Sequence, residues 1–293
     1  MRASEGRRRV RRGLVLALLG LGAVGLSPVQ AALAASTLPT IGVHSGSGSG
    51  FSVTGDLNRH AGRVLMNFTN SNAHGSDVVL LKLLHGTSMA TVIRDIAAQG
   101  GEKTAAASTR ALTRETHLVG GAGLQAPGQS AQVTETLYSG TYYLLDVNAI
   151  FAGHKPMVKA LHVHGTPTRS TFPHIGAIIA MNSPDRFVSP SRLPVGQNLL
   201  VRNVSDTIHF VAFQPVRAGT TDADMTKLFK GESKNDPYTG PGVEADVLSP
   251  GTQLIFHSSV LKKGRYDLEC FIADDVTGMP HALMGMHKIV TVA

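Results

Sequence analysis

The sequence repeats itself once, and this repeat limits the folds that are open to the chain. Matching landmarks in the two halves lie between 123 and 133 residues apart. The pairs are Gly86 with Gly219, Pro127 with Pro250, and Tyr142 with Tyr266. Solenoid repeats have periods of about 20–50 residues, so a repeat of this length indicates a duplicated domain. We therefore expect two tandem domains, over residues 36–167 and 168–293.

Both halves are dominated by short segments with the apolar pattern of β-strands. In the first half this pattern predicts strands over 63–67, 77–84, 131–137, 140–146 and 157–163. The second half repeats the order, with strands predicted over 199–203, 208–216, 253–258, 264–270 and 287–292. Each half has one short helical insert, over 89–98 with Ser88 as the N-cap, and over 222–229. The sequence thus predicts an all-β fold of two tandem β-sandwiches.

Residues 1–35 have the composition of an export signal. Several arginines precede an apolar run over 13–26, which is shorter than the roughly 20 residues needed to cross a bilayer. Ala32 and Ala34 then form an A-x-A pattern, which predicts cleavage near Ala34 or Ala35. We expect a secreted or extracytoplasmic protein, and an uncleaved membrane anchor is the alternative. Arg11 and Arg12 also fit a loose twin-arginine pattern, so the export route stays open.

The positive charge of the chain is concentrated in this N-terminal segment. The whole chain has a formal net charge of +7, but residues 1–35 contain six arginines and one acid. The remainder has 21 basic and 19 acidic residues, a net charge of +2. The mature chain therefore lacks the basic surface that is typical of nucleic-acid binding. We expect no nucleic-acid partner, and no membrane span in the mature chain.

The second half contains a set of side chains suited to a metal ion. His209 begins a predicted strand, Cys270 ends another, and His281 and Met286 precede the last one. Two imidazoles, one thiolate and one thioether form the ligand set of a type 1 copper site. A trigonal plane of two His and one Cys with a long axial Met bond suits both Cu(I) and Cu(II). Cys270 is also the only cysteine, and an unpaired thiol in an exported protein calls for an explanation.

With these motifs, residues 176–293 resemble a cupredoxin (blue-copper) domain, and residues 38–165 look like a second, degenerate one. The matching pieces are the segment from Asn203 to His209, the Pro250-Gly251 turn, Gly264-x-Tyr266 leading to Cys270, and His281-x₄-Met286. The resemblance implies two Greek-key sandwiches and one copper ion in the C-terminal domain. It also implies that His209, Cys270 and His281 are the in-plane ligands and Met286 the axial ligand.

One feature departs from the family pattern. Ten residues, 271–280, separate Cys270 from His281, which is more than in most blue-copper loops. The polar residues of this insert suggest that it bulges into solvent, and a longer loop costs little conformational entropy. Met284 or Met279 could also replace Met286 as the axial ligand.

The first half lacks the ligands. Ser76 stands at the position that corresponds to His209, and Asp146 at the position that corresponds to Cys270. Without a thiolate we expect no blue-copper centre there. The first domain would then have a structural role or present a binding surface.

The segment His162-Val-His164-Gly165 has the H-x-H-G form used by multicopper oxidases. However, Cys270 is flanked by Glu269 and Phe271 rather than by the histidines that such oxidases need. We therefore expect that the protein is not an enzyme. The predicted function is that of an exported copper-binding one-electron carrier or copper-handling protein with an unknown redox or copper-transfer protein partner. The alternative is a metal-free cupredoxin-fold module for extracellular binding or structure.

Overall fold

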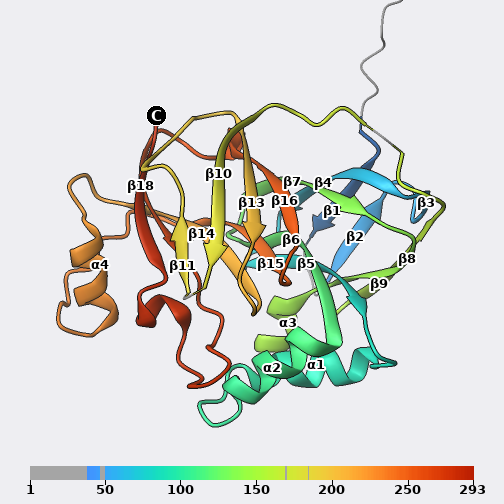
Figure 1. Ribbon diagram of the computed structural model, residues 1–293, viewed down its shortest axis with the longest axis horizontal. Helices are drawn as coiled ribbons and strands as arrows, with labels where there is room; N and C mark the ends of the chain where they lie inside the picture. Colours follow the sequence, from blue (N-terminus) through green and yellow to red (C-terminus); the bar gives the residue numbers. More distant parts are fainter. Residues whose placement is uncertain (1–37, 47–49, 169, 184) are drawn as a thin grey trace, which may run out of the picture. The chain divides into compact units, whose positions relative to one another are not determined.

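A computed structural model of the chain describes residues 38–46, 50–168, 170–183 and 185–293. The predicted export signal, residues 1–35, lies outside these residues. Residues 38–293 form one compact unit, and Figure 1 labels most of its helices and strands. In the part of the chain that is described, no helix combines the length and the apolar character needed to cross a membrane.

The strands form two sheets, and each sheet runs through both halves of the chain. The small sheet has eight strands in the order β11-β10-β13-β16-β7-β4-β1-β2. From first to last in the chain, these are β1 (Thr40–Ser45), β2 (Phe51–Thr54), β4 (Gly62–Asn70), β7 (Ser130–Leu137), β10 (Ile175–Asn182), β11 (Arg186–Val188), β13 (Asn198–Asn203) and β16 (Gln253–His257).

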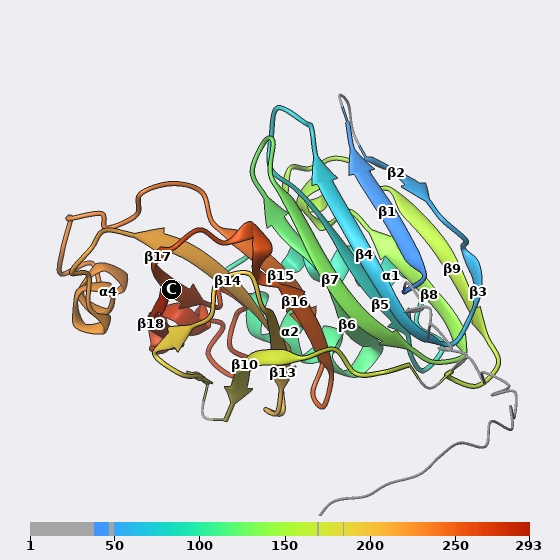
Figure 2. The same cartoon turned by 90° about the horizontal axis from the view of Figure 1, so that it is seen from above.

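The large sheet has ten strands in the order β12-β18-β17-β14-β15-β6-β5-β8-β9-β3. These are β3 (Asn58–His60), β5 (Ser76–Leu83), β6 (Thr116–Gln125), β8 (Gly140–Leu145), β9 (Val158–His164), β12 (Arg192–Leu193), β14 (His209–Val216), β15 (Val243–Leu248), β17 (Gly264–Glu269) and β18 (His287–Val292). Figure 2 shows strands of the two halves side by side where β6 and β7 meet β15 and β16.

The strand order is symmetric about the join between the halves. The halves join through the antiparallel pair β7–β16 in the small sheet and the antiparallel pair β6–β15 in the large sheet. Outward from each join, the strands of the first half follow the same order as their counterparts in the second half. The prediction of an all-β fold of β-sandwich type is confirmed, and the structure adds that both sheets continue from one half of the chain into the other. The division into domains at residue 167 stays a prediction.

The main apolar core lies between the sheets and extends through both halves. Phe213 of β14 and Phe256 of β16 stack across it, with ring centroids 4.9 Å apart. The paired landmarks Tyr142 and Tyr266 make the same contact, because each phenol oxygen accepts a hydrogen bond from the backbone N–H four residues earlier. This contact fixes the start of β8 and of β17 in the same way.

The described residues also form four α-helices and two short 3₁₀ helices: α1 (Met89–Ala98), α2 (Ala105–Glu115), α3 (Val147–Phe151), α4 (Asp222–Phe229), η1 (Ser258–Val260) and η2 (His281–Met284). The two predicted helices are confirmed as α1 and α4, and Ser88 caps α1 as expected. Helix α2 was not predicted because Leu112 is its only large apolar residue, which leaves the helical pattern weak. Helices α1, α2 and α3 gather at one end of the strands, away from α4 (Figure 1).

Strand β6, which joins the halves in the large sheet, was not predicted either. It contains Gly120 and Gly121, both with positive φ, and its register with β5 shifts beside them. A Cβ atom at Gly121 would lie only 2.1 Å from the carbonyl oxygen of Val78, so the close strand approach requires glycine. Because glycine is depleted in strands, the sequence pattern did not indicate one here.

Candidate metal centre

The four predicted ligands lie at one end of the large sheet. His209 is the first residue of β14, Cys270 follows β17 directly, and Met286 directly precedes β18. Because β17 is antiparallel to both β14 and β18, the end of β17 lies beside the starts of β14 and β18, at the same end of the sheet. His281, the first residue of η2, lies in the connection between β17 and β18. All four side chains are fully buried.

The structure brings the three predicted in-plane ligands into contact. The Sγ atom of Cys270 lies 3.6 Å from Nδ1 of His209 and 3.7 Å from Nδ1 of His281. The two imidazole rings are 4.6 Å apart between centroids and inclined by 50°. All three candidate ligand atoms lie within 4.8 Å of one another. The side chains therefore converge on one point from three different segments.

These spacings fit a metal ion placed between the three atoms. Metal–sulfur and metal–nitrogen bonds of about 2.3 and 2.0 Å, the lengths found at zinc, would separate sulfur and nitrogen by about 3.5–3.7 Å for tetrahedral to trigonal angles. The alternative is a pair of hydrogen bonds without a metal. A thiol has one proton and can donate to only one imidazole, so the other histidine would have to donate to the sulfur. A metal ion satisfies both nitrogen atoms and the sulfur at once.

Burial favours Met286 over its neighbours as the fourth predicted ligand. Met279 and Met284 are 48% and 46% exposed, whereas Met286 is fully buried. The Met286 backbone N–H donates a hydrogen bond to the carbonyl oxygen of His281 at 2.9 Å, which ties the two residues together. Gly285 between them has φ 109°, a left-handed conformation that lets the chain turn from η2 into β18.

A buried amide holds the turn that leads into His209. The Asn203 side chain donates hydrogen bonds to the carbonyl oxygens of Thr207 and Leu248, at 2.7 and 2.8 Å. Its Oδ1 atom accepts hydrogen bonds from the backbone N–H and the hydroxyl of Ser205. Asn70 makes the corresponding pair of bonds in the first half. The turn before His209 is therefore fixed by a fully bonded buried side chain.

The ten-residue insert between Cys270 and His281 reaches solvent only in part: Ile272, Ala273 and Asp274 are buried, whereas Val276 is 79% exposed. Helix α2 of the first half holds it: the Thr109 hydroxyl donates to the carbonyl oxygen of Ala273 at 2.8 Å, and Arg110 donates to the carbonyl oxygen of Asp275. Within the insert, the Asp274 carboxylate accepts hydrogen bonds from Val276 and Thr277. The first half thus supports the ligand loop of the second half.

Asp185, in the turn before β11, is a site residue that sequence analysis missed. Its two carboxylate oxygens lie 3.3 Å from Nε2 of His209 and 3.5 Å from Nε2 of His281. Neither contact has the geometry of a hydrogen bond. Both Nε2 atoms are therefore without a hydrogen-bond partner among the described residues. When Nδ1 of a histidine binds a metal, its Nε2 carries the proton, and a carboxylate beside it orients the ring. No spacing pattern in the sequence links Asp185 to the histidines.

The electrostatics of the centre favour a thiolate. Burial raises the pKa of Cys270, but hydrogen bonds and charge from His209 and His281 outweigh it and lower the pKa to about 6. Burial lowers the pKa of His209, but contact with Asp185 and with Cys270 outweighs it and raises the pKa to about 9. The contact with His209 lowers the pKa of Asp185, although burial opposes it. The thiolate is the form of cysteine that binds a metal.

The first half has no comparable centre among its described residues. Ser76 begins β5, and the Asp146 carboxylate caps α3 by accepting a hydrogen bond from the N–H of Ala149. His162 and His164 of the H-x-H-G segment are exposed on β9. No group of three His, Cys, Asp or Glu side chains able to hold one metal ion occurs in the described residues before residue 168.

Comparison with known proteins gives structural likenesses only. No protein-family model matches the chain, and no curated protein matches it. Similar solved structures include the blue copper protein auracyanin A from Chloroflexus aurantiacus, at 22% identity over 43% of this chain and 98% of that chain, with a TM-score of 0.32. A purple cupredoxin from Nitrosopumilus maritimus has 14% identity over 40% of this chain and 99% of that chain, with a TM-score of 0.25. A blue copper oxidase from Nitrosomonas europaea has 10% identity over 86% of this chain and 84% of that chain, with a TM-score of 0.22.

The prediction that the protein is not an enzyme is contradicted. Three of the similar structures are copper oxidases that cover 86–87% of this chain, and so extend through both of its halves. We withdraw that prediction. Likenesses at 10–16% identity assign no activity to this chain, so its function has to be inferred from the centre itself.

Replacing Asp185 tests its role at the histidine rings. In an Asp185→Asn variant the neutral amide no longer offers a negative charge to both Nε2 atoms, so we expect copper affinity to fall by about 10–100-fold. The affinity is measured by competition with a copper chelator. Asp236→Asn, a change at an exposed aspartate, is the matched control and should retain wild-type affinity. An affinity of the Asp185→Asn variant within twofold of wild type would contradict this role.

Proposed function

We propose that the protein binds one copper ion through His209, Cys270 and His281, with Met286 as the axial ligand, and that this centre transfers single electrons or handles copper. The observation that supports this most directly is the approach of both Nδ1 atoms to the Cys270 sulfur, at 3.6 and 3.7 Å. Copper bound to such a ligand set cycles between Cu(I) and Cu(II). The ligands are all buried, which favours a rigid centre.

The donor set favours copper over zinc. A structural zinc site takes four strong donors, usually cysteines and histidines in a tetrahedron. Among the described residues three strong donors converge here, and the fourth predicted ligand is a buried thioether, which suits copper. Asp185 does not provide the missing donor, because it contacts the Nε2 atoms on the far side of the rings. The site thus fits the copper that the sequence predicts.

The surface beside the ligands supports a protein redox or copper-transfer partner. His281 is fully buried, but three apolar side chains close to it in the chain, Met279, Leu283 and Met284, are 37–48% exposed. Exposed apolar groups in one short segment are a common feature of contact surfaces. We propose that the partner contacts this segment, since Met279 and Leu283 lie two residues from His281 and Met284 lies two residues from Met286.

The test is an absorption spectrum after Cu(II) is added to the protein and excess metal is removed. A copper–thiolate site gives an intense blue or green colour, and we expect about one copper ion retained per chain. A metal-free cupredoxin-fold module, the alternative, would stay colourless and retain no copper. That outcome would contradict the proposed function.

We also propose that the chain is exported after cleavage near Ala34 or Ala35. The support is the run of arginines, the short apolar segment and the A-x-A pattern in residues 1–35. Determining the N-terminal residue of the protein made in its native host tests this. An intact Met1 would contradict cleavage.

A further inference from the structure

A cavity of about 320 Å³ lies next to the metal centre and belongs to no part of the proposed function. Its walls come from helices α1, α2 and α3 and from strands β5, β6 and β15, so both halves of the chain form it. Ile208 and Phe210, on either side of His209, also line it, as do Phe271 and Ile272 after Cys270. Ligand pockets in proteins have volumes of about 300–1,000 Å³, so the cavity is large enough for a small molecule.

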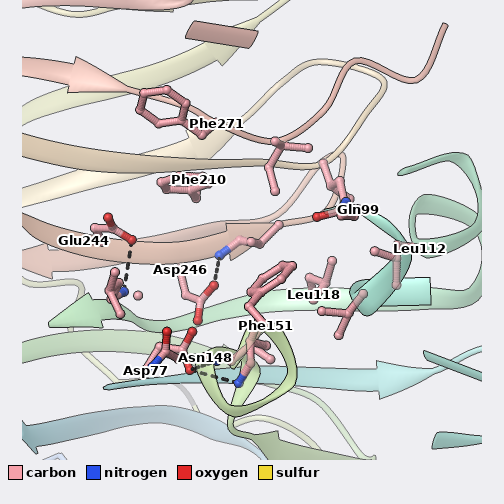
Figure 3. Close-up of a pocket in the computed structure, with 18 of the residues that line it drawn as sticks. Asp77, Gln99, Leu112, Leu118, Asn148, Phe151, Phe210, Glu244, Asp246 and Phe271 are labelled. Atoms are coloured by element: carbon pink, nitrogen blue, oxygen red, sulfur yellow. Dashed lines mark hydrogen bonds between the residues drawn. The ribbon is translucent and has the colours of Figure 1, made fainter. Parts of the chain in front are cut away.

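The cavity combines an apolar wall with a row of carboxyl groups. Figure 3 shows Glu244, Asp246 and Asp77 along one side, and Leu112, Leu118 and Gln99 on the other. Phe151, Phe271 and Leu124 are 54%, 44% and 41% exposed, so they mark the side where the cavity opens to solvent. An apolar body can enter past these side chains and reach the carboxyl groups.

Each of the three carboxyl groups is anchored by the backbone through one oxygen. Asp246 accepts a hydrogen bond from the N–H of Val247 at 2.6 Å, and Glu244 accepts one from the N–H of Leu124 at 3.0 Å. Asp77 accepts two, from the first residues of α3. These bonds orient the carboxyl groups without neutralising them, because backbone N–H groups carry no formal charge.

Asp246 has a carboxyl oxygen without a hydrogen-bond partner among the described residues, which indicates a place for a ligand. It is only 7% exposed, and its Oδ2 atom has no hydrogen-bond partner among the described residues. The lining residues include three acids but no lysine, arginine or histidine. Burial raises the pKa of Asp246 to about 7, and burial together with the charge of Asp246 raises the pKa of Asp77. A cation beside these groups would offset the cost of burying them.

A single metal ion does not fit this arrangement as well as an extended ligand does. Among the described residues, the groups of three side chains whose ligand atoms lie within 4.8 Å of one another do not include Asp77, Glu244 or Asp246. The three carboxyl groups are therefore spread along the wall rather than gathered around one point. A ligand with a charged end and an apolar body matches both the acids and the aromatic side chains.

We propose that this cavity binds an amphipathic organic cation, with its protonated amine against Asp246 and its apolar body between Phe151 and Phe210. The unpartnered carboxylate oxygen would accept a hydrogen bond from the amine. The neighbouring carboxyl groups of Asp77 and Glu244 would offer further oxygen atoms to the amine. The aromatic rings would remove the apolar body from water, and their faces also attract a nearby cation.

Isothermal titration of the full chain with 4-phenylbutylamine and with 4-phenyl-1-butanol tests the proposal. The two probes have nearly the same shape, but only the amine carries a charge. We expect the amine to bind at least tenfold more tightly than the alcohol. Equal affinities would show that the cavity is only an apolar pocket and would overturn the proposal. Absence of binding by either probe would overturn it as well.

Variants locate the site and separate it from the metal centre. Asp246→Asn should weaken amine binding at least tenfold and leave alcohol binding within twofold, whereas the exposed control Asp236→Asn should change neither. Phe151→Ala, a change at a half-exposed residue where the cavity opens to solvent, should weaken the binding of both probes. Cys270→Ala should bind the amine as wild type does, because Cys270 is not among the residues that line the cavity. Unchanged amine affinity in Asp246→Asn, with circular dichroism confirming the fold, would exclude the proposed site.

Discussion

A Cys270→Ala variant should lose the intense visible colour of the copper-loaded protein and retain little copper after excess metal is removed. The thiolate is the soft donor of the proposed centre, and its sulfur is the atom that both Nδ1 atoms approach. Without it, two imidazoles and a thioether remain, and they give no copper–thiolate absorption. The measurement is the visible spectrum together with the copper content of wild type and variant, prepared side by side.

The fold should survive this substitution. Cys270 is fully buried within the core, so its replacement by alanine removes one sulfur atom and lowers the free energy of unfolding by about 1 kcal/mol. Met284→Ala removes a sulfur from an exposed side chain of the same loop and is the control that should keep both colour and copper. Met286→Leu should keep the colour but alter the reduction potential, since the axial ligand tunes it. Colour retained in the Cys270→Ala variant would refute the assignment of the thiolate.

The cluster of His209, Cys270 and His281 could be predicted from the sequence because its residue types and their places at strand ends are both visible there. Each ligand is placed at or beside a strand or helix boundary, and those boundaries are marked by local patterns. His209, Cys270 and His281 meet as predicted, and burial favours Met286 over Met279 and Met284. Local sequence patterns are sufficient to predict such a cluster where antiparallel pairing brings the strand ends together at one end of the sheet.

The rest of the site depends on contacts between distant segments, which local patterns do not record. Asp185 lies in a turn before a three-residue strand, and no periodicity marks it. The docking of the ligand loop on α2 joins Thr109 and Ala273, which are far apart in the chain. Among the acids of the cavity, Asp77 lies in a predicted strand, whereas Glu244 and Asp246 lie in β15, which was not predicted. The acids come close together because β6 pairs with β15. The glycine-rich sequence of β6 has no strand pattern from which this pairing could be predicted.

A buried acid in the core makes the stability of the protein depend on pH. Glu135 on β7 is 1% exposed, and neither of its carboxyl oxygens has a hydrogen-bond partner among the described residues. Burial, and then the charge of Asp246, raises its pKa to about 8. In the unfolded chain a glutamate has a pKa of about 4.3. Between these two values the folded protein holds a proton that the unfolded chain has lost.

The free energy of unfolding should therefore fall as the pH rises from about 4.3 towards 8. The contribution from Glu135 is fully present below the lower value and is lost by the time the pH passes the upper one. A difference of one in pKa corresponds to about 1.4 kcal/mol, so the loss amounts to several kcal/mol. Glutamine at this position resembles the protonated acid but cannot ionise. We expect Glu135→Gln to be more stable than wild type at pH 9 and no more stable at pH 4.

Denaturant unfolding of the metal-free protein, followed by circular dichroism at pH 4, 7 and 9, measures this difference. Metal-free protein is used because copper binding would add its own pH dependence. Glu232→Gln, a change at an exposed glutamate, is the matched control and should follow the wild-type curve. The neighbouring acids Asp246 and Glu244 also have raised pKa values because they are buried, so wild type and variant should both lose some stability. The separation between their curves belongs to Glu135, and parallel curves would mean that this carboxyl group is not buried as a neutral acid.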